Sequence, residues 1–148
     1  MDSLETPIGT LWLGGDELGL RTISFERPPD AGRGGSAVSE ARDQLNAYFA
    51  GELEEFHLQL APHGTRFQRS VWDAVADIPY GATATYSEIA AELGRPSACR
   101  AVGAANGRNP LPIVVPCHRV IGSTGALTGY GGGLGRKRAL LDLETAAG

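Results

Sequence analysis

The segment Pro112–Val120 constrains the backbone of this chain more than any other stretch. Proline fixes its own φ, offers no backbone N–H, and biases the residue before it toward extended conformations. The prolines at 112 and 116 therefore exclude a continuous helix, and Cys117 and His118 come directly after an extended apolar run. The segment predicts a rigid mount for one thiol next to one imidazole.

A lone cysteine is most often a buried, unreactive side chain. Taken alone, the Cys117–His118 pair would favour that interpretation. The surrounding sequence favours a functional interpretation, because two candidate helices around a short turn precede the pair, and a glycine-rich loop with one tyrosine and a late carboxylate follow it. Cys117 is therefore a candidate nucleophile.

Length and composition favour a small globular protein. The chain has 148 residues, of which 42% are hydrophobic, and this is enough for a packed core. No apolar run approaches the roughly 18 residues of a membrane span, and the start of the chain lacks the basic and apolar regions of a signal peptide. We expect a soluble, cytoplasmic protein with no membrane contact.

The two cysteines, Cys99 and Cys117, are too few for a disulfide scaffold, and a reducing compartment would leave both as thiols. Zinc needs about four ligands. The cysteines and the histidines at 57, 63 and 118 show no close ligand spacing. We expect no metal and no other cofactor.

The formal net charge of −4 is unevenly divided along the chain. Residues 1–85 hold 6 basic and 13 acidic side chains, whereas residues 86–148 hold 7 basic and 4 acidic ones. The cationic surface therefore belongs to the C-terminal part. A modest local excess is compatible with nucleic acid held by a few phosphate contacts, and also with an ordinary surface.

Alternating apolar residues in the first sixty positions predict short strands, and one segment has apolar side chains at helical spacing. A hairpin would turn at Gly14–Asp16, and the Pro and Gly content of a later stretch indicates a loop. We expect strands at 8–13, 18–25 and 56–60, a loop at 28–36, and a helix at 39–49.

Cap residues and apolar spacing predict four helices in the second half of the chain. Gly94, Arg95 and Pro96 separate two of them and turn the chain. Two helices around a short glycine-containing turn form the helix-turn-helix pattern of DNA-binding proteins, although many helical corners share it. We expect helices at 66–76, 86–93, 98–106 and 136–144, the first three capped by Thr65, Thr85 and Ser97.

The helix at 98–106 is unusual for one that reads a base sequence. A reader of the major groove needs several long polar side chains, whereas here Arg100 and Asn106 project among alanines and glycines. Small residues let a backbone approach a duplex closely. We expect sequence-independent binding in a groove, with the minor groove favoured and one long side chain free to enter the base stack. Packing against another helix explains the composition equally well.

Residues 122–135 hold seven glycines around Tyr130. The stretch lacks the ending of a phosphate-binding loop and the glycine spacing of a dinucleotide fold. We interpret it as a backbone wall that closes on a flat ligand. Three cations, Arg136, Lys137 and Arg138, follow it, and they are candidates for phosphate contacts or for solvation.

Five motifs in this half of the chain carry a resemblance to a known family. Together they resemble the O6-alkylguanine-DNA alkyltransferases, the direct-reversal DNA repair proteins also called methylated-DNA–protein-cysteine methyltransferases. The resemblance runs from about residue 65 to residue 144, and residues 1–60 match more loosely. The motifs are Pro116–Arg119, Thr85–Ala90, Arg100–Gly103, Asn109–Pro110 and Gly129–Gly133.

The resemblance implies a mixed α/β (α+β) fold. Residues 1–62 would form a small ribonuclease-H-like α/β domain, and residues 63–148 a mainly helical winged-helix or helix-turn-helix domain with the DNA-binding and active sites. Some members bind zinc in the first domain, but this chain has no cysteine before Cys99, so no zinc is expected. The implied partner is double-stranded DNA containing alkylated guanine, bound by a monomer with no obligate protein partner.

The resemblance also implies that Cys117 accepts the alkyl group of O6-alkylguanine, and of O4-alkylthymine, in one irreversible turnover. Adjacent side chains do not face each other on a helix. The family's solution is a water between Cys117 and His118, with Glu144 behind the imidazole. That relay lowers the effective pKa of the thiol.

The same resemblance assigns the other positions of the motifs. Tyr86 would donate to the guanine ring nitrogen, and Asn109 would be the hinge between the recognition helix and the active-site loop. Arg100 would take the place of the extruded base in the stack. The substrate wall would comprise Tyr130, Gly131, Gly132 and Val120, and the DNA surface Arg100, Ala101, Ala104, Arg95 and Arg119.

Three other functions fit parts of the sequence. A winged-helix transcription factor with a structural or redox-sensing Cys117 would bind a specific DNA sequence and would tolerate Cys117→Ser. A cysteine hydrolase would turn over, but its cysteine and histidine are normally far apart in sequence. A protein that only binds the lesion would not need the cysteine. Cys99 departs from the family's small apolar residue, and we interpret it as a packed thiol, with a second alkylation or oxidation site as the lesser alternative.

Overall fold

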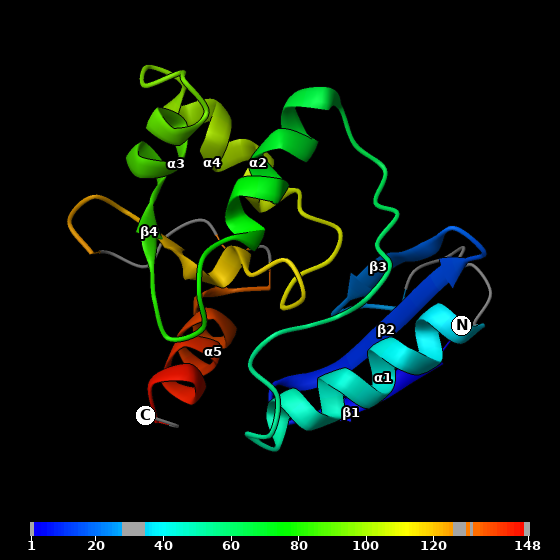
Figure 1. Ribbon diagram of the computed structural model, residues 1–148. Coiled ribbons are helices and arrows are strands. Elements are labelled where there is room, and N and C mark those ends of the chain that lie inside the picture. Colours follow the sequence, from blue (N-terminus) through cyan, green and yellow to red (C-terminus); the bar gives the residue numbers. More distant parts are fainter. Residues whose placement is uncertain (1, 28–34, 126–129, 131, 147–148) are drawn as a thin grey trace. The chain divides into compact units, whose positions relative to one another are not determined.

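The computed structural model describes residues 2–27, 35–125, 130 and 132–146. Its backbone divides into two compact units, Met1–His63 and Gly64–Gly148. Figure 1 shows a sheet with one long helix in the first unit and several shorter helices in the second. Within the described residues, no helix is long and apolar enough to cross a membrane.

The first unit is a three-stranded antiparallel sheet covered by one helix. Strands β1 (Asp2–Thr6), β2 (Gly9–Asp16) and β3 (Gly19–Ser24) lie in the order β1-β2-β3, and α1 (Ser36–Phe49) packs against all three. Alternate strand side chains enter the core because successive residues point to opposite faces. The buried core includes Leu11, Leu13 and Leu20 of the sheet and Val38, Leu45 and Tyr48 of the helix.

The predicted hairpin is confirmed, but β2 continues through the positions where the sequence predicted the turn. A register shift lies between Gly14 and Gly15. A Cβ on Gly15 would lie 2.7 Å from the carbonyl oxygen of Gly19, so the glycine allows a close approach of two strands. The predicted helix at 39–49 is also confirmed, and it begins earlier, at Ser36.

The predicted strand at 56–60 is wrong. Its alternating residues form one isolated bridge, between Leu20 and Leu60. The side chain of Gln44 hydrogen-bonds both the backbone N–H and the carbonyl of His57, at 2.8 and 3.0 Å. Because a side chain satisfies these backbone groups, no neighbouring strand is required. The side chain of His57 is exposed, as expected.

The second unit is mainly helical. A pair of two-residue parallel strands joins the chain before the helix-turn-helix to the chain after Cys117. The mixed α/β class, with a sheet in the first unit and a mainly helical second unit, is therefore confirmed. The elements are α2 (Arg66–Ala76), β4 (Ala84–Thr85), α3 (Tyr86–Glu92), α4 (Cys99–Gly107), the 3-10 turn η1 (Cys117–Arg119), β5 (Val120–Ile121) and α5 (Leu134–Ala146).

Two of the three predicted helix caps are confirmed. The hydroxyls of Thr65 and Thr85 accept the backbone N–H three residues on, and Gln68 and Glu88 return a bond to the cap residue. These reciprocal bonds satisfy two donors that a helix start otherwise leaves unpaired. The third prediction is wrong, because α4 starts after Ala98 and has no side-chain cap.

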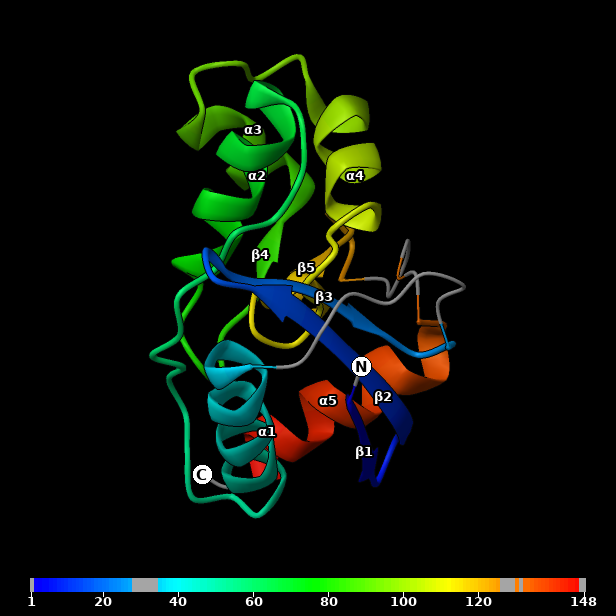
Figure 2. The ribbon, with the colours of Figure 1, turned by 90° about the vertical axis from the view of Figure 1, so that its right-hand side faces the viewer.

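Helices α3 and α4 form the predicted pair around a tight turn. Gly94 has a φ of +73°, a left-handed conformation that glycine adopts without a steric penalty. Both helices pack against α2, and the indole N–H of Trp72 donates to the carbonyl of Ala105 at 2.8 Å. Figure 2 shows the three helices gathered at one end of this unit. The ring of Tyr86 lies beside α4 at Gly103.

The capping bonds predict a selective effect on stability. Thr85→Ala removes the acceptor of the Glu88 N–H, and it should lower the free energy of unfolding by about 1 kcal/mol. Ser97→Ala is the matched control, because Ser97 is exposed and does not cap α4. Thermal or denaturant unfolding of both variants checks this. A loss for Ser97→Ala as large as that for Thr85→Ala would contradict it.

Candidate active site

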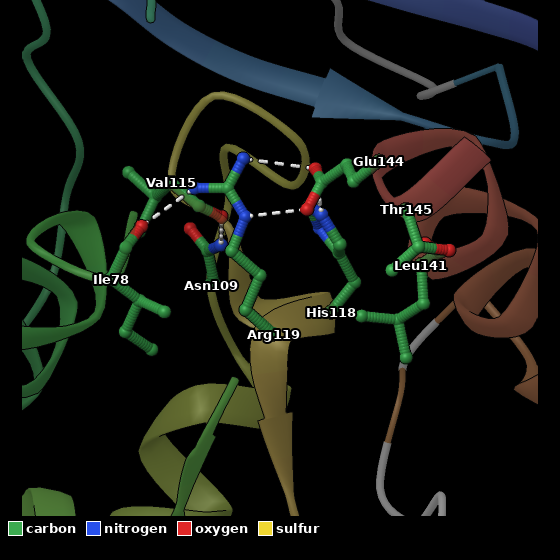
Figure 3. Close-up of polar contacts among 8 residues, drawn as sticks. All are labelled: Ile78, Asn109, Val115, His118, Arg119, Leu141, Glu144 and Thr145. Atoms are coloured by element: carbon green, nitrogen blue, oxygen red, sulfur yellow. Dashed lines mark hydrogen bonds and ion pairs between the residues drawn. The ribbon is translucent and has the colours of Figure 1, made fainter. Parts of the chain in front are cut away.

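Cys117 sits in a short, tightly bonded segment. Its side chain is buried, and its backbone N–H donates to the carbonyl of Val115 at 2.7 Å. Asn109 braces the same segment from outside: its amide donates to the Val115 carbonyl at 2.8 Å and accepts from the Leu111 N–H at 2.9 Å. Figure 3 shows Asn109 directed at Val115. The predicted rigid mount is therefore present in the backbone bonding.

Ile113 adds strain to this mount. Its φ is +77°, a left-handed value that a β-branched residue adopts only under constraint. Such a backbone costs on the order of 1–3 kcal/mol. The side chain of Ile113 is 1% exposed, so burial in the core holds a conformation that the local sequence disfavours.

Burial has the largest influence on the thiol. It raises the pKa of Cys117 to about 11, while the amide of Asn109 and the charge of Lys137 act in the opposite direction. The pKa is therefore raised, in contrast to the lowered value that the sequence led us to expect. At neutral pH the sulfur carries its proton, and a reaction through the thiolate needs a base.

His118 is a candidate for that base, because it follows Cys117 directly in the chain. The side chain is fully buried, and Nε2 lies 2.6 Å from Oε2 of Glu144. Burial lowers the pKa of His118 despite the opposing effect of Glu144, so the imidazole is neutral at pH 7. Glu144 is held as a carboxylate by Arg119 and can only accept, so Nε2 carries the hydrogen and Nδ1 keeps its lone pair.

The structure corrects the prediction that Arg119 contacts DNA. Its side chain is buried, and its guanidinium makes two bonds with Glu144, Nε to Oε1 at 2.8 Å and Nη2 to Oε2 at 2.9 Å. Nη1 donates to the carbonyl of Ile78 at 2.7 Å, as Figure 3 shows. A two-pronged Arg–carboxylate bond is geometrically specific. Arg119 therefore fixes Glu144 instead of a phosphate.

Lys137 also lies inside the protein, where the sequence allowed phosphate or solvent. It is fully buried on α5, and Nζ donates to the carbonyl of Val120 at 2.6 Å. Its ammonium is close enough to Cys117 to affect the thiol pKa. Helix α5 thus supplies two groups to the site, Glu144 and Lys137.

The two tyrosines expected at the substrate, Tyr130 and Tyr86, differ in burial. Tyr130 is buried, and burial raises its pKa, with a further rise from the charge that Cys117 would carry as a thiolate. Tyr130 and Cys117 are therefore close enough for their charges to interact. Tyr86 is half-buried at the start of α3. Of the wall positions, Val120 is buried and Gly132 half-buried, and Gly131 lies outside the described residues.

The residues expected at a DNA surface lie on the outside of the helix-turn-helix. Arg100, Ala101 and Ala104 are exposed on α4. Arg95 is exposed in the preceding turn, with its guanidinium over the ring of Phe67. The small side chains leave the helix backbone open to close approach, while Arg100 projects from its first turn.

Both units match domains of one protein family. Residues 66–146 match the DNA binding domain of 6-O-methylguanine DNA methyltransferase, and residues 2–62 match its ribonuclease-like domain. The chain belongs to this methyltransferase family. The resemblance inferred from the five motifs is therefore confirmed.

Individual relatives agree along nearly the whole chain. The chain is 53% identical over 150 residues to the methylated-DNA–protein-cysteine methyltransferase of Methanosarcina barkeri, covering 97% of this chain and 95% of the relative. A crystal structure of Mycobacterium tuberculosis O6-methylguanine methyltransferase has a TM-score of 0.90 at 51% identity, covering 99% of this chain and 92% of that one. Mycobacterium tuberculosis OGT in complex with DNA has a TM-score of 0.91 at 52% identity, covering 98% and 92%.

Sequence reasoning missed Asn106 as a contact of the methyltransferase site. Asn106 is buried near the end of α4, and its amide donates to the carbonyl of Cys117 at 3.3 Å. The sequence offered one signal, since a polar residue stands among small ones on a helix. That signal indicated a projection toward DNA, whereas the side chain points inward.

The burial of Arg119 predicts a stability defect for its removal. Arg119→Met leaves the Glu144 carboxylate buried without its main partner, and the free energy of unfolding should fall by about 3–5 kcal/mol. Adding Glu144→Leu removes the stranded charge and should recover much of this loss. Arg100→Met is the control, because an exposed side chain should change stability by no more than about 0.5 kcal/mol. Denaturant unfolding measures all three, and an unaffected Arg119→Met would contradict the burial argument.

Proposed function

We propose that this chain repairs DNA by direct reversal of alkylation. It is a methylated-DNA–protein-cysteine methyltransferase that moves the alkyl group of O6-alkylguanine onto its own Cys117, and we extend this to O4-alkylthymine. The observation that carries the proposal is a buried thiol followed directly in the chain by a buried, neutral imidazole, which a fixed carboxylate backs. In this proposal the imidazole accepts the thiol proton, so that the sulfur reacts as a thiolate.

The transfer is a displacement at the alkyl carbon. The thiol proton passes to Nδ1 of His118, through the water that the family resemblance implies, and the sulfur attacks the alkyl carbon. The S–C bond forms as the C–O6 bond breaks, and the electron pair leaves with guanine, whose ring nitrogen takes a proton from Tyr86. The proton that the thiol released then passes from the His118 imidazolium through solvent to the tyrosinate, so that both groups end neutral. Glu144 stabilises the imidazolium, and Arg119 keeps Glu144 ionised.

Nothing in the proposed chemistry regenerates the thiol. The product is a thioether, and an S-alkyl cysteine has no good leaving group. The reaction is therefore stoichiometric, with one alkyl group accepted by each protein molecule. This distinguishes the proposal from a cysteine hydrolase, which would turn over, and from a transcription factor, which would not react.

The DNA is held by α4, and the lesion leaves the duplex to reach the buried sulfur. In this proposal Arg100 fills the position of the extruded base, Ala101 and Ala104 allow α4 to approach the groove, and Arg95 contacts phosphate. Asn109 links α4 to the active-site segment through its bond with Val115. The extruded base lies against a wall that comprises Tyr130, Val120, Gly131 and Gly132.

We also infer how the whole chain is organised and where it acts. Residues 1–62 and 63–148 act as two domains, close to the two compact units of the backbone. The protein works as a cytoplasmic monomer on double-stranded DNA, without a cofactor or an obligate protein partner. Sedimentation with and without DNA would test the monomer.

Intact-protein mass should show the transfer directly. After incubation with a duplex carrying O6-methylguanine, the protein mass should increase by one methyl group, and peptide mapping should place it on Cys117. Cys117→Ala should remain unmodified, while Cys99→Ala should react like the unaltered protein because the second thiol is not the acceptor. More than one repaired base per protein molecule would contradict single-turnover transfer.

The role given to Arg100 predicts a difference between two substrates. Unstacking a base costs a few kcal/mol, and free O6-benzylguanine needs no unstacking. Arg100→Ala should therefore slow transfer from duplex DNA far more than transfer from the free base. Arg108→Ala, which removes another exposed cation, is the charge-matched control. Equal losses of transfer rate on both substrates would contradict the proposal that Arg100 fills the position of the extruded base.

A further inference from the structure

Asn106 makes a contact that joins two parts of the proposed machinery. It lies near the C-terminal end of α4, is 2% exposed, and its Nδ2 donates to the backbone carbonyl of Cys117 at 3.3 Å. A carbonyl can only accept, so the amide nitrogen must face it. The helix proposed to hold DNA is thus bonded directly to the residue that carries the acceptor sulfur.

This bond is a poor device for stability. The Cys117 carbonyl already accepts the backbone N–H of Val120, and Oδ1 of Asn106 is buried without a hydrogen-bond partner among the described residues. A buried polar atom without a partner costs about 1–3 kcal/mol. An apolar side chain of similar size would avoid that cost, so the amide is best explained by what it positions.

Another contact fixes the position of α4 relative to α2. Trp72 holds the Ala105 carbonyl, one residue before Asn106, and Arg100 projects from the first turn of the same helix. Asn106 lies six positions after Arg100, which is about 9 Å of helix at 1.5 Å per residue. A shift of α4 relative to Cys117 would therefore separate the extruded base from the sulfur.

We propose that Asn106 is a positioning residue that sets the register between α4 and Cys117, so that a base extruded by α4 arrives at the sulfur. The inference rests on the proposed function, because it needs transfer from DNA to Cys117. Asn106 touches neither DNA nor the alkyl carbon, and it acts through the Cys117 carbonyl. Its loss should affect a substrate presented by α4 and spare one that diffuses freely to the thiol.

The experiment compares two substrates in single-turnover reactions. Asn106→Leu should slow transfer from a saturating O6-methylguanine duplex by about 10-fold to 100-fold, because a misplacement of 1 Å can cost about 10²-fold. Transfer from free O6-benzylguanine should change little. The melting temperature should stay the same or rise, because the unpaired amide oxygen is gone. Asn106→Ala serves as a second variant if leucine does not fit.

Trp72→Phe is the matched control, because it removes a buried bond to the neighbouring residue of α4 without touching Cys117. It should lower stability more than Asn106→Leu and slow duplex transfer less. A 2-aminopurine beside the lesion reports base extrusion, and its signal should persist in Asn106→Leu but fall in Arg100→Ala. Both results follow from a register role and not from a general loosening of the helix.

Several outcomes would overturn the inference while leaving the function intact. Duplex transfer at the unaltered rate in both Asn106 variants would remove any positioning role. Equal losses on duplex and free base would show that the amide acts on the thiol itself and not through α4. A protein with unaltered Asn106 that transfers no alkyl group from duplex DNA would instead refute the proposed function.

Discussion

The buried pair between Arg119 and Glu144 is the interaction on which the rest of the site depends. It joins the turn η1, which contains Cys117, to α5, and the remaining guanidinium nitrogen bonds the carbonyl of Ile78, two residues after α2 ends. The same pair fixes the charge of Glu144, which in turn fixes the tautomer of His118. One ion pair therefore sets both the position of the turn and the proton chemistry of its imidazole.

The site reconciles protection of the thiol with reactivity. Burial keeps Cys117 protonated and shields it from small electrophiles in water, since the thiolate is the reactive form. The same burial lowers the pKa of His118, so a neutral imidazole, the candidate base, follows a thiol that stays protonated at neutral pH. In the proposed reaction, the thiol therefore reacts only when a substrate enters the site and its guanine leaves with the electron pair of the broken bond.

The sequence predicted features that depend on neighbouring residues. The capping boxes at Thr65 and Thr85 are confirmed because a cap and its partner lie within one turn. The helix-turn-helix followed from Gly94 in the same way. By contrast, the alternation at 56–60 failed because the side chain of Gln44, distant in sequence, occupies the backbone groups of His57.

Local sequence patterns could not predict which charged and polar side chains are buried. Arg119 and Lys137 look in the sequence like other cations near a DNA-binding helix. Only the packing of α5 against the turn at Cys117–Arg119 brings Glu144 to Arg119 and buries Lys137 at the carbonyl of Val120. Asn106 likewise looked like a surface projection. The five family motifs named most of the candidate site, but they could not assign the direction in which each side chain points.

The left-handed backbone of Ile113 has a consequence for the segment that carries the acceptor sulfur. Burial of the Ile113 side chain holds a backbone conformation that a β-branched residue otherwise avoids. The order of the acceptor segment therefore depends on packing around one apolar side chain as well as on its hydrogen bonds. A smaller residue at position 113 would weaken that packing and release the strained backbone beside the sulfur.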